Sequence, residues 1–340
     1  MINILTKSKW RKYNENLTKK LENLKKLVNE DGAIAALAID QRGSMEKMMG
    51  AANPDLNNVE GIGAYKELVS KELTPFASSI LLDPIYGEKG IAARANNAGL
   101  ILSYEQTGYD EYDEGRLPRL INFMSVLRAK EMGANAIKTL LYYDFDDEEE
   151  TNDIKKAWVE RVGYECEGLG LPHFLEIITY DRNMESEKNA EYAKVRPHKV
   201  NTAMKEFSDP KYKVDVLKVE TPTNMNFVEG LGKEEAVYTR EEAIKYFKDQ
   251  SDSTNLPFIF LSGGITAELF QETLKLAKEA ESQFNGVLCG RATWKDSVEI
   301  FGKDQNEAKK WLETTGRENI QTLNEVLKET AHSVFEKIEK

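Results

Sequence analysis

The chain has 340 residues, of which 41% are hydrophobic and 9% aromatic, so it can build a full globular core and is not disordered as a whole. Its 46 basic and 58 acidic residues give a net charge of -12, which disfavours binding to nucleic-acid phosphates and to anionic lipid surfaces. Its apolar stretches are far shorter than the roughly 20 residues that span a bilayer, and we expect a cytoplasmic protein with no membrane or nucleic-acid partner.

The predicted elements begin with a helix and continue as an alternation of strands and helices. Leucines at helical spacing within residues 9–28 predict an amphipathic helix in an N-terminal extension, residues 1–30. Eight short, apolar, β-rich runs follow, and most of the gaps between them hold charged helical patterns. The runs are residues 33–40, 78–83, 99–105, 136–143, 173–180, 214–220, 257–263 and 286–292. The charged tail, residues 303–340, predicts C-terminal helices that cover one face of the fold or mediate association, which leaves a homo-oligomer open.

The order of these elements indicates the fold class. Continuous apolar strands separated by helices are typical of a parallel sheet that is buried on both faces. Eight such units without a Gly-x-Gly-x-x-Gly turn favour an α/β fold of the closed (β/α)8 TIM barrel type over a doubly wound sheet. No linker rich in Pro, Gly or Ser divides the chain, so we expect a single domain over residues 1–340. The least regular unit joins the second and third runs, where residues 91–97 leave room only for a short helix.

Residue types that bind metals are sparse. The chain has three histidines without paired spacing, and its two cysteines, Cys166 and Cys289, are far apart. Neither a histidine-bound zinc site nor a thiolate cage is suggested, and we expect both cysteines to be buried free thiols. The prediction is therefore an enzyme without a metal or another cofactor.

Charged residues late in the apolar runs are the first functional candidates, because catalysis in such barrels occurs at the carboxyl ends of the strands. Lys138, Glu176 and Lys218 lie on the fourth, fifth and sixth runs, each between apolar neighbours, so all three are expected to point inward. Burying an unpaired charge costs several kcal/mol, so these groups must pair with one another or with a ligand. A structural ion pair is the alternative to a functional set.

These three residues suit Schiff-base catalysis. A lysine amine must be unprotonated to attack a ketone, and burial and a neighbouring cation both lower a lysine pKa. We interpret Lys218 as the amine, Lys138 as the cation and Glu176 as the group that moves protons. Glu220 lies two residues after Lys218, hence on the same strand face, and either orients that lysine or shares in proton transfer.

The end of the first run supplies further candidates. Asp40 could hold a lysine or bind a hydroxyl group, Gln41 supplies an amide, and Arg42 could contact a phosphate. The alternative is a turn whose charges face solvent.

The last two runs end in Ser262-Gly263-Gly264 and Gly290-Arg291. Loops after these two strands of a barrel commonly bind phosphate through backbone N-H groups, and glycine permits a close approach. A strand-to-helix turn alone would also explain the glycine pair.

Taken with their neighbours, these residues resemble the class I tagatose 1,6-bisphosphate (diphosphate) aldolase family of bacteria. The resemblance covers the chain from about residue 30 to the tail. The matching segments are Ala-Ile-Asp-Gln-Arg-Gly (38–43), Ser-Ser-Ile-Leu-Leu-Asp-Pro (78–84), Leu-Leu-Tyr-Tyr-Asp (140–144), Val-Leu-Lys-Val-Glu (216–220), Ala-Glu-Leu-Phe-Gln-Glu-Thr-Leu (267–274) and Gly-Val-Leu-Cys-Gly-Arg-Ala-Thr-Trp (286–294).

The resemblance implies a metal-independent lyase on a (β/α)8 barrel. Such enzymes cleave D-tagatose 1,6-bisphosphate to dihydroxyacetone phosphate and D-glyceraldehyde 3-phosphate, in the tagatose 6-phosphate pathway of lactose and galactose catabolism. It implies that Lys218 forms the Schiff base and that Glu176 is the acid/base. The supporting residues would be Asp40, Gln41, Arg42 and Lys138, and the phosphate contacts Ser262 and Arg291. Members accept epimeric ketohexose bisphosphates, so the preferred epimer stays open.

Three alternatives stay open. The first is a related class I aldolase for a sulfonated fructose phosphate, since Arg and backbone N-H groups bind a sulfonate and a phosphate alike. The second is a sugar-phosphate sensor on the same barrel, because a fold does not fix a function. The third is a metal-dependent aldolase, which the small number of histidines opposes.

Overall fold

The structure is a computed structural model that describes residues 15–106 and 114–338. In these residues eight parallel strands pair in chain order, and β1 also pairs with β8, so that the sheet closes into a barrel. The strands are β1 (Ile34–Ala38), β2 (Ser79–Leu82), β3 (Gly99–Ser103), β4 (Ala136–Tyr143), β5 (His173–Thr179), β6 (Val216–Val219), β7 (Phe258–Leu261) and β8 (Gly286–Cys289). Each lies within the run predicted for it, and the (β/α)8 barrel is confirmed.

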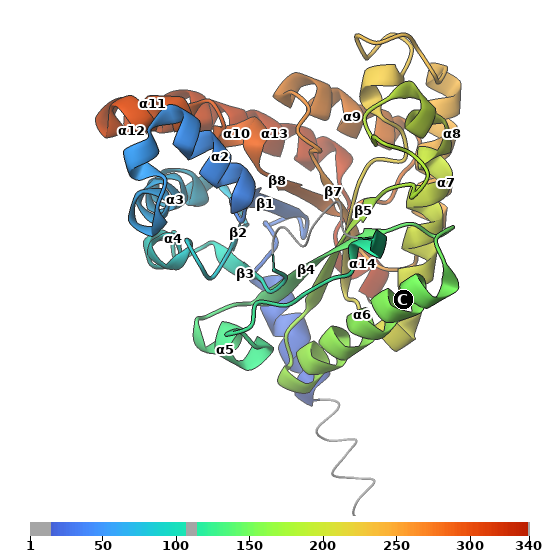
Figure 1. The fold of residues 1–340 in the computed structure, drawn as a ribbon, viewed down its shortest axis with the longest axis horizontal. Helices are drawn as coiled ribbons and strands as arrows, with labels where there is room; N and C mark the ends of the chain where they lie inside the picture. Colours follow the sequence, from blue (N-terminus) through green and yellow to red (C-terminus); the bar gives the residue numbers. More distant parts are fainter. Residues whose placement is uncertain (1–14, 107–113, 339–340) are drawn as a thin grey trace, which may run out of the picture.

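Helices surround the strands (Figure 1). The α-helices are α2 (Gly43–Ala52), α3 (Val59–Leu73), α4 (Glu88–Ala93), α5 (Val126–Glu131), α6 (Glu149–Leu169), α7 (Ala190–Phe207), α8 (Arg240–Asp252), α9 (Ala267–Glu279), α10 (Arg291–Trp294), α11 (Ser297–Lys303), α12 (Gln305–Trp311), α13 (Arg317–Thr330) and α14 (Phe335–Ile338). Short 3₁₀ segments are η1 (Pro54–Leu56), η2 (Thr74–Phe76), η3 (Glu114–Arg116), η4 (Pro210–Tyr212) and η5 (Met225–Phe227), and η6 (Leu312–Gly316) is a π-helical segment. The predicted C-terminal helices are present, and the short helix between β2 and β3 begins earlier than expected.

The alternation of side chains along each strand decides what faces the interior of the barrel. One core cluster lies inside the barrel, and it includes Ala136, Phe174 and Val216 from three adjacent strands. A charged residue follows each of them two positions later, on the same strand face. These residues are Lys138, Glu176 and Lys218. The prediction that they point inward together therefore agrees with the strand geometry.

The amino end of the barrel is closed by the first helix. Residues 15–25 are helical, and Leu24 and Leu27 pack in the inner cluster together with Val334, which follows α13. Lys20 Nζ lies 2.8 Å from Asp215 Oδ2 and ties this helix to the start of β6. The predicted helix of residues 9–28 is thus present in part, and its residues 9–14 lie outside the described residues.

In the part of the chain that the structure describes, no helix combines the length and the apolar character needed to cross a membrane. Cys166 and Cys289 are both buried and free, as predicted.

Candidate active site

Six charged side chains meet inside the barrel at the carboxyl ends of its strands, and each is less than one-tenth exposed. We call this set the charge cluster; its members are Asp40 and Arg42 after β1, Glu105 after β3, Lys138 on β4, Glu176 on β5 and Lys218 on β6. With three cations and three anions the cluster is neutral when all six groups are ionised. Mutual pairing is what makes their burial tolerable.

Lys138 lies at the centre of the charge cluster. Its Nζ is 3.0 Å from Asp40 Oδ2, 3.0 Å from Glu105 Oε1 and 2.5 Å from Glu176 Oε2. The other oxygen of Glu176, Oε1, is 2.7 Å from Lys218 Nζ, since the two residues are partners in the β5–β6 register. Glu176 therefore bridges the two lysines.

In the charge cluster, the neighbouring opposite charges together shift the pKa values more strongly than burial does. Burial lowers the pKa of Lys138, but the carboxylates of Asp40, Glu105 and Glu176 hold it well above its usual value. Burial raises the pKa of Glu176, but Lys138 and Lys218 hold it below its usual value. The pKa of Asp40 is also depressed, against burial, by Lys138 and then Lys218. Lys138 thus stays protonated, and Glu176 and Asp40 are ionised in this arrangement.

Glu105 is the member of the charge cluster that the sequence interpretation missed. Its Oε1 contacts both Lys138 Nζ and Arg42 Nη2, the latter at 3.2 Å, and its backbone oxygen accepts a hydrogen bond from Arg42 Nη1 at 2.9 Å. The signal was present, because Glu105 ends the third apolar run just as charged residues mark the other runs. Alternating charges thus run from Arg42 through Glu105, Lys138 and Glu176 to Lys218.

The segment after β1 is not a solvent-facing turn. Arg42 is directed to Glu105, so a phosphate at its guanidinium would have to compete with that carboxylate. Gln41 lies beside the end of β8, where a Cβ added to Gly290 would be 3.3 Å from Gln41 Nε2. Among the described residues, the buried Oε1 of Gln41 has no hydrogen-bond partner. The side chain is thus available to a substrate hydroxyl.

A second buried ion pair, which lies outside the barrel strands, supports the segment that follows β1. Lys66 of α3 and Asp83, which follows β2, are both fully buried and bonded to each other. Lys66 Nζ also donates a hydrogen bond to the backbone oxygen of Gln41 at 2.8 Å. The candidates chosen from the sequence were charged residues at the ends of predicted strands. Lys66 lies in a helical pattern, so it was not among them.

The loops after β7 and β8 form one surface. Ser262 is buried, whereas Gly263, Gly264 and Arg291 are exposed. The two glycines have positive φ angles of 58° and 82°. A Cβ on Gly264 would be 3.2 Å from Arg291 Nη2, so the guanidinium lies directly against this glycine. Exposed backbone beside an arginine suits an anion such as phosphate, and the structure brings these predicted residues together.

A family model described as DeoC/LacD family aldolase matches residues 34–296. The chain belongs to this aldolase family. Tagatose 1,6-diphosphate aldolase 2 of Enterococcus faecalis is 56% identical to it, over 92% of this chain and 95% of the relative. The tagatose 1,6-diphosphate aldolase of Staphylococcus epidermidis is 54% identical, over 92% of this chain and 97% of the relative. The family resemblance inferred from the sequence segments is confirmed.

Solved aldolase structures share the fold of this family member. Fructose-bisphosphate aldolase from Plasmodium falciparum has a TM-score of 0.64 at 16% identity, over 91% of this chain and 95% of that chain. A Schiff-base-forming fructose-1,6-bisphosphate aldolase has a TM-score of 0.56 at 16% identity, over 90% and 98%. These similarities support the barrel fold.

Glu220 lies outside the charge cluster of this aldolase. Strand β6 ends at Val219, so the alternation of faces does not extend to Glu220. Its Oε2 accepts hydrogen bonds from the backbone N and the Oγ1 of Thr179, both at 2.8 Å, and its Oε1 is 3.2 Å from Arg196 Nη2. The prediction that Glu220 faces the interior beside Lys218 is wrong, because this carboxylate ties β5 to α7 instead.

Acidic residues after β4 and β5 share one lysine as an ion-pair partner. Lys199 Nζ of α7 is 2.5 Å from Asp144 Oδ1, 2.8 Å from Asp146 Oδ2 and 3.0 Å from Asp181 Oδ2. Within residues 15–106 and 114–338, no group of three or more His, Cys, Asp or Glu residues is arranged to hold a metal ion.

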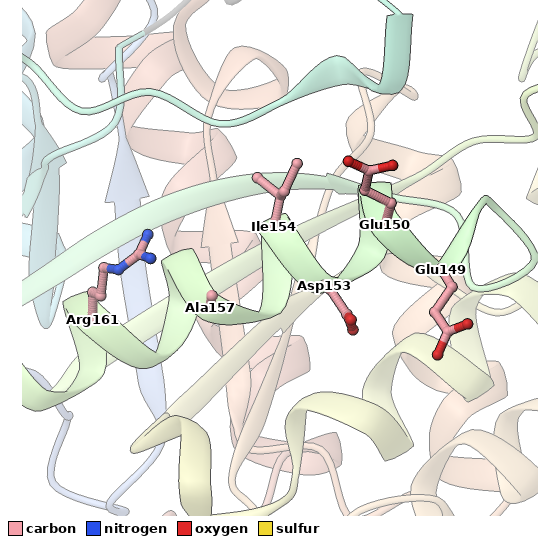
Figure 2. A pocket seen from close by; sticks show the side chains of 6 residues that line it. All are labelled: Glu149, Glu150, Asp153, Ile154, Ala157 and Arg161. Atoms are coloured by element: carbon pink, nitrogen blue, oxygen red, sulfur yellow. The ribbon is translucent and has the colours of Figure 1, made fainter.

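A hollow on the outside of the aldolase barrel lies along α6 (Figure 2). It is lined by Glu149, Glu150, Asp153, Ile154, Ala157 and Arg161. Figure 2 shows Glu150 and Ile154 on one side of the helix, and Glu149 and Asp153 on the other. The hollow contains no predicted site residue and no member of the charge cluster, so the barrel interior is the candidate active site.

The glycine beside Arg291 gives a testable prediction. We expect Gly264→Ala to raise KM for a phosphorylated substrate about ten-fold, because its Cβ displaces Arg291 and a hydrogen bond to a charged group is worth roughly 1.5–3 kcal/mol. Gly230→Ala is the matched control, since Gly230 also has a positive φ, 77°, but no atom within 4 Å of an added Cβ. Steady-state kinetics check this result, and equal KM values for the two variants would contradict it.

Proposed function

We propose that this aldolase cleaves D-tagatose 1,6-bisphosphate to dihydroxyacetone phosphate and D-glyceraldehyde 3-phosphate through a Schiff base on Lys218. The substrate is supported by the relatives, which are named for tagatose 1,6-diphosphate at 56% and 54% identity. The chemistry is supported above all by the buried contact of 2.7 Å between Lys218 Nζ and Glu176 Oε1. The reaction would belong to the tagatose 6-phosphate pathway of lactose and galactose catabolism.

The first step in this proposal is a proton transfer within the charge cluster. Lys218 must be neutral to attack a carbonyl carbon. A proton that moves from Lys218 to Glu176 leaves the cluster neutral, whereas its release to solvent would leave a buried net charge of -1. The contact between Lys218 and Glu176 therefore supplies both a neutral amine and a proton donor.

Covalent chemistry then follows at the substrate ketone. Lys218 Nζ attacks C2 and forms a carbinolamine, and Glu176 donates its proton to the C2 hydroxyl, which leaves as water and gives the iminium ion. Glu176, again a carboxylate, accepts the proton of the C4 hydroxyl. The C3–C4 bond breaks, its electrons move to the iminium ion, and the aldehyde is released. Protonation of the enamine at C3 and hydrolysis release dihydroxyacetone phosphate and free Lys218.

Other residues position the substrate in this proposal. Arg291, Ser262 and the backbone of Gly263 and Gly264 bind one phosphate. Asp40 holds Lys138 in place, and Gln41 binds a substrate hydroxyl through its unpartnered oxygen. Arg42 is held by Glu105 and is best placed to fix the cluster.

The remaining parts of the proposal concern the whole chain. We propose that it acts as one domain, because residues from both ends pack into the core of the barrel. A cytoplasmic location suits an enzyme whose substrate and products are small phosphorylated metabolites. Its partners would be these small molecules, with no nucleic acid or membrane, and a homo-oligomer stays open.

The proposal is tested by substrate assays and by covalent trapping. We expect cleavage of D-tagatose 1,6-bisphosphate, and faster cleavage of it than of a sulfonated fructose phosphate. Borohydride reduction in the presence of dihydroxyacetone phosphate, followed by peptide mass mapping, should give a stable adduct on Lys218. An adduct on Lys138 would exchange the roles of the two lysines. Loss of activity in EDTA with recovery in zinc would favour a metal-dependent mechanism, and binding without turnover would favour a sensor.

A further inference from the structure

We infer that Glu105 is a positioning residue of the proposed reaction: its carboxylate fixes Lys138 and Arg42 and keeps the charge cluster neutral, so that Lys218 and Glu176 share one proton. The inference rests on the proposed function. It concerns a residue that neither the strand pattern nor the family resemblance selected.

The contacts of Glu105 place it next to the catalytic pair and not within it. Its Oε1 lies 3.0 Å from Lys138 Nζ and 3.2 Å from Arg42 Nη2. Both partners keep their protons, since an arginine does not titrate in proteins and the pKa of Lys138 is raised. Glu105 thus has no partner with which to exchange a proton in these contacts. Its effect on Lys218 must pass through Lys138 and Glu176.

The backbone of Glu105 is held as firmly as its side chain. Glu105 forms an isolated antiparallel bridge with Leu120, and its backbone oxygen accepts a hydrogen bond from Arg42 Nη1 at 2.9 Å. Its neighbour Tyr104 donates a backbone hydrogen bond to the oxygen of Lys138 at 2.9 Å. The carboxylate is only 3% exposed. A fixed, buried anion acts on neighbouring protonation equilibria with little screening by water.

Counting the charges gives the direction of this effect. With Glu105 the cluster has three cations and three anions; with a neutral amide at this position it has three cations and two anions. A buried excess of positive charge makes each remaining proton easier to lose. The unprotonated state of the Lys218–Glu176 pair then forms at lower pH. That state has an amine but lacks the proton that Glu176 must donate to the carbinolamine.

The surrounding charged groups do not reverse this direction. Asp40, Glu176 and Lys218 belong to the cluster and are already counted. The neighbouring Lys66–Asp83 pair cancels its own charge. Burial raises the pKa of Tyr86, the aromatic residue beside that pair, to about 12, so it stays neutral in the range of the assay.

A competing role is also visible in the structure. Among the described residues, Glu105 Oε2 and Arg42 Nε are buried without hydrogen-bond partners. One is an acceptor and the other a donor, which together suit a hydroxyl group or a water molecule. If Glu105 acts by holding a substrate hydroxyl, its loss raises KM without moving the pH profile. Kinetics over a range of pH therefore distinguish the two roles.

The test uses Glu105→Gln, which removes the charge and keeps the size. We expect the alkaline limb of kcat/KM to move to lower pH by roughly one unit, and kcat to fall with little change in KM. Glu105→Asp keeps the charge and should return the limb to its position in the unaltered protein. Glu165→Gln is the matched control, because the Glu165 carboxylate binds the Val126 backbone and the Tyr104 hydroxyl, outside the cluster.

Arg42→Gln supplies a test with the opposite sign. It removes a cation from the same chain of contacts, so the alkaline limb should move to higher pH. Circular dichroism shows whether each variant is folded. An unmoved alkaline limb in a folded Glu105→Gln protein overturns the inference, and so do shifts of both charge variants in the same direction. Failure of the proposed function is recognised separately, because borohydride trapping then gives no Lys218 adduct in the unaltered protein.

Discussion

Lys218→Met should lower turnover of D-tagatose 1,6-bisphosphate by at least about 10⁴-fold, because in the proposed mechanism the covalent bond to C2 forms on the Lys218 amine, which methionine lacks. Lys218 Nζ is the group that contacts Glu176 Oε1, and methionine fills similar space without an amine. A coupled assay for dihydroxyacetone phosphate measures the loss. Borohydride trapping should yield no adduct with this variant.

Lys155→Met is the matched control for this experiment. Lys155 is also fully buried, its Nζ donates a hydrogen bond to the Tyr180 hydroxyl at 2.8 Å, and burial lowers its pKa to about 8. It is therefore a buried lysine outside the charge cluster that is suited to compete as a nucleophile. We expect Lys155→Met to retain the adduct on Lys218. Trapping on Lys155 in the unaltered protein would contradict the assignment.

Glu176→Gln should lower turnover by roughly 10²–10⁴-fold while the protein stays folded, the range for loss of a positioned acid/base. Glutamine keeps the size of the side chain but can neither accept the proton of Lys218 nor return one to the carbinolamine. Steady-state kinetics, with circular dichroism as the check on folding, measure this effect. Because the amine remains, slow trapping should still label Lys218.

Glu220→Gln provides the control for this second change. Glu220 is a half-buried glutamate at the end of the next strand, but its carboxylate binds Thr179 and Arg196. We expect turnover close to that of the unaltered protein. A large loss in Glu220→Gln together with normal turnover in Glu176→Gln would transfer the acid/base role to Glu220.

The strands were predictable because each is buried on both faces. A segment such as β2, Ser79–Leu82, has no exposed residue, so its apolar run stands out from the charged helices around it. The same contrast made Lys138 a candidate, because a charged residue is conspicuous within an apolar run. The ends of the runs were less informative, since polar residues there fit a strand end and a loop equally well.

The unpredicted parts of the site depend on contacts between distant segments. Glu105 pairs with Arg42, two residues from different loops, and the sequence spacing does not state which side chains meet there. Lys66 reaches Asp83 and Gln41 from a helix outside the strands. Glu220 was misplaced because the rule of alternating faces was extended one residue beyond the end of β6. In each case three-dimensional packing, not local pattern, decided the position.

The closed amino end of the barrel has a consequence for the order of events. Leu24, Leu27 and Val334 fill that end, so the reactants and both products must pass through the opposite opening. In the proposed reaction the three-carbon ketone half is still tethered to Lys218 when the carbon chain is cut. The aldehyde half must therefore depart first, and in the synthetic direction the ketone must load before the aldehyde. Product-inhibition patterns should show this compulsory sequence.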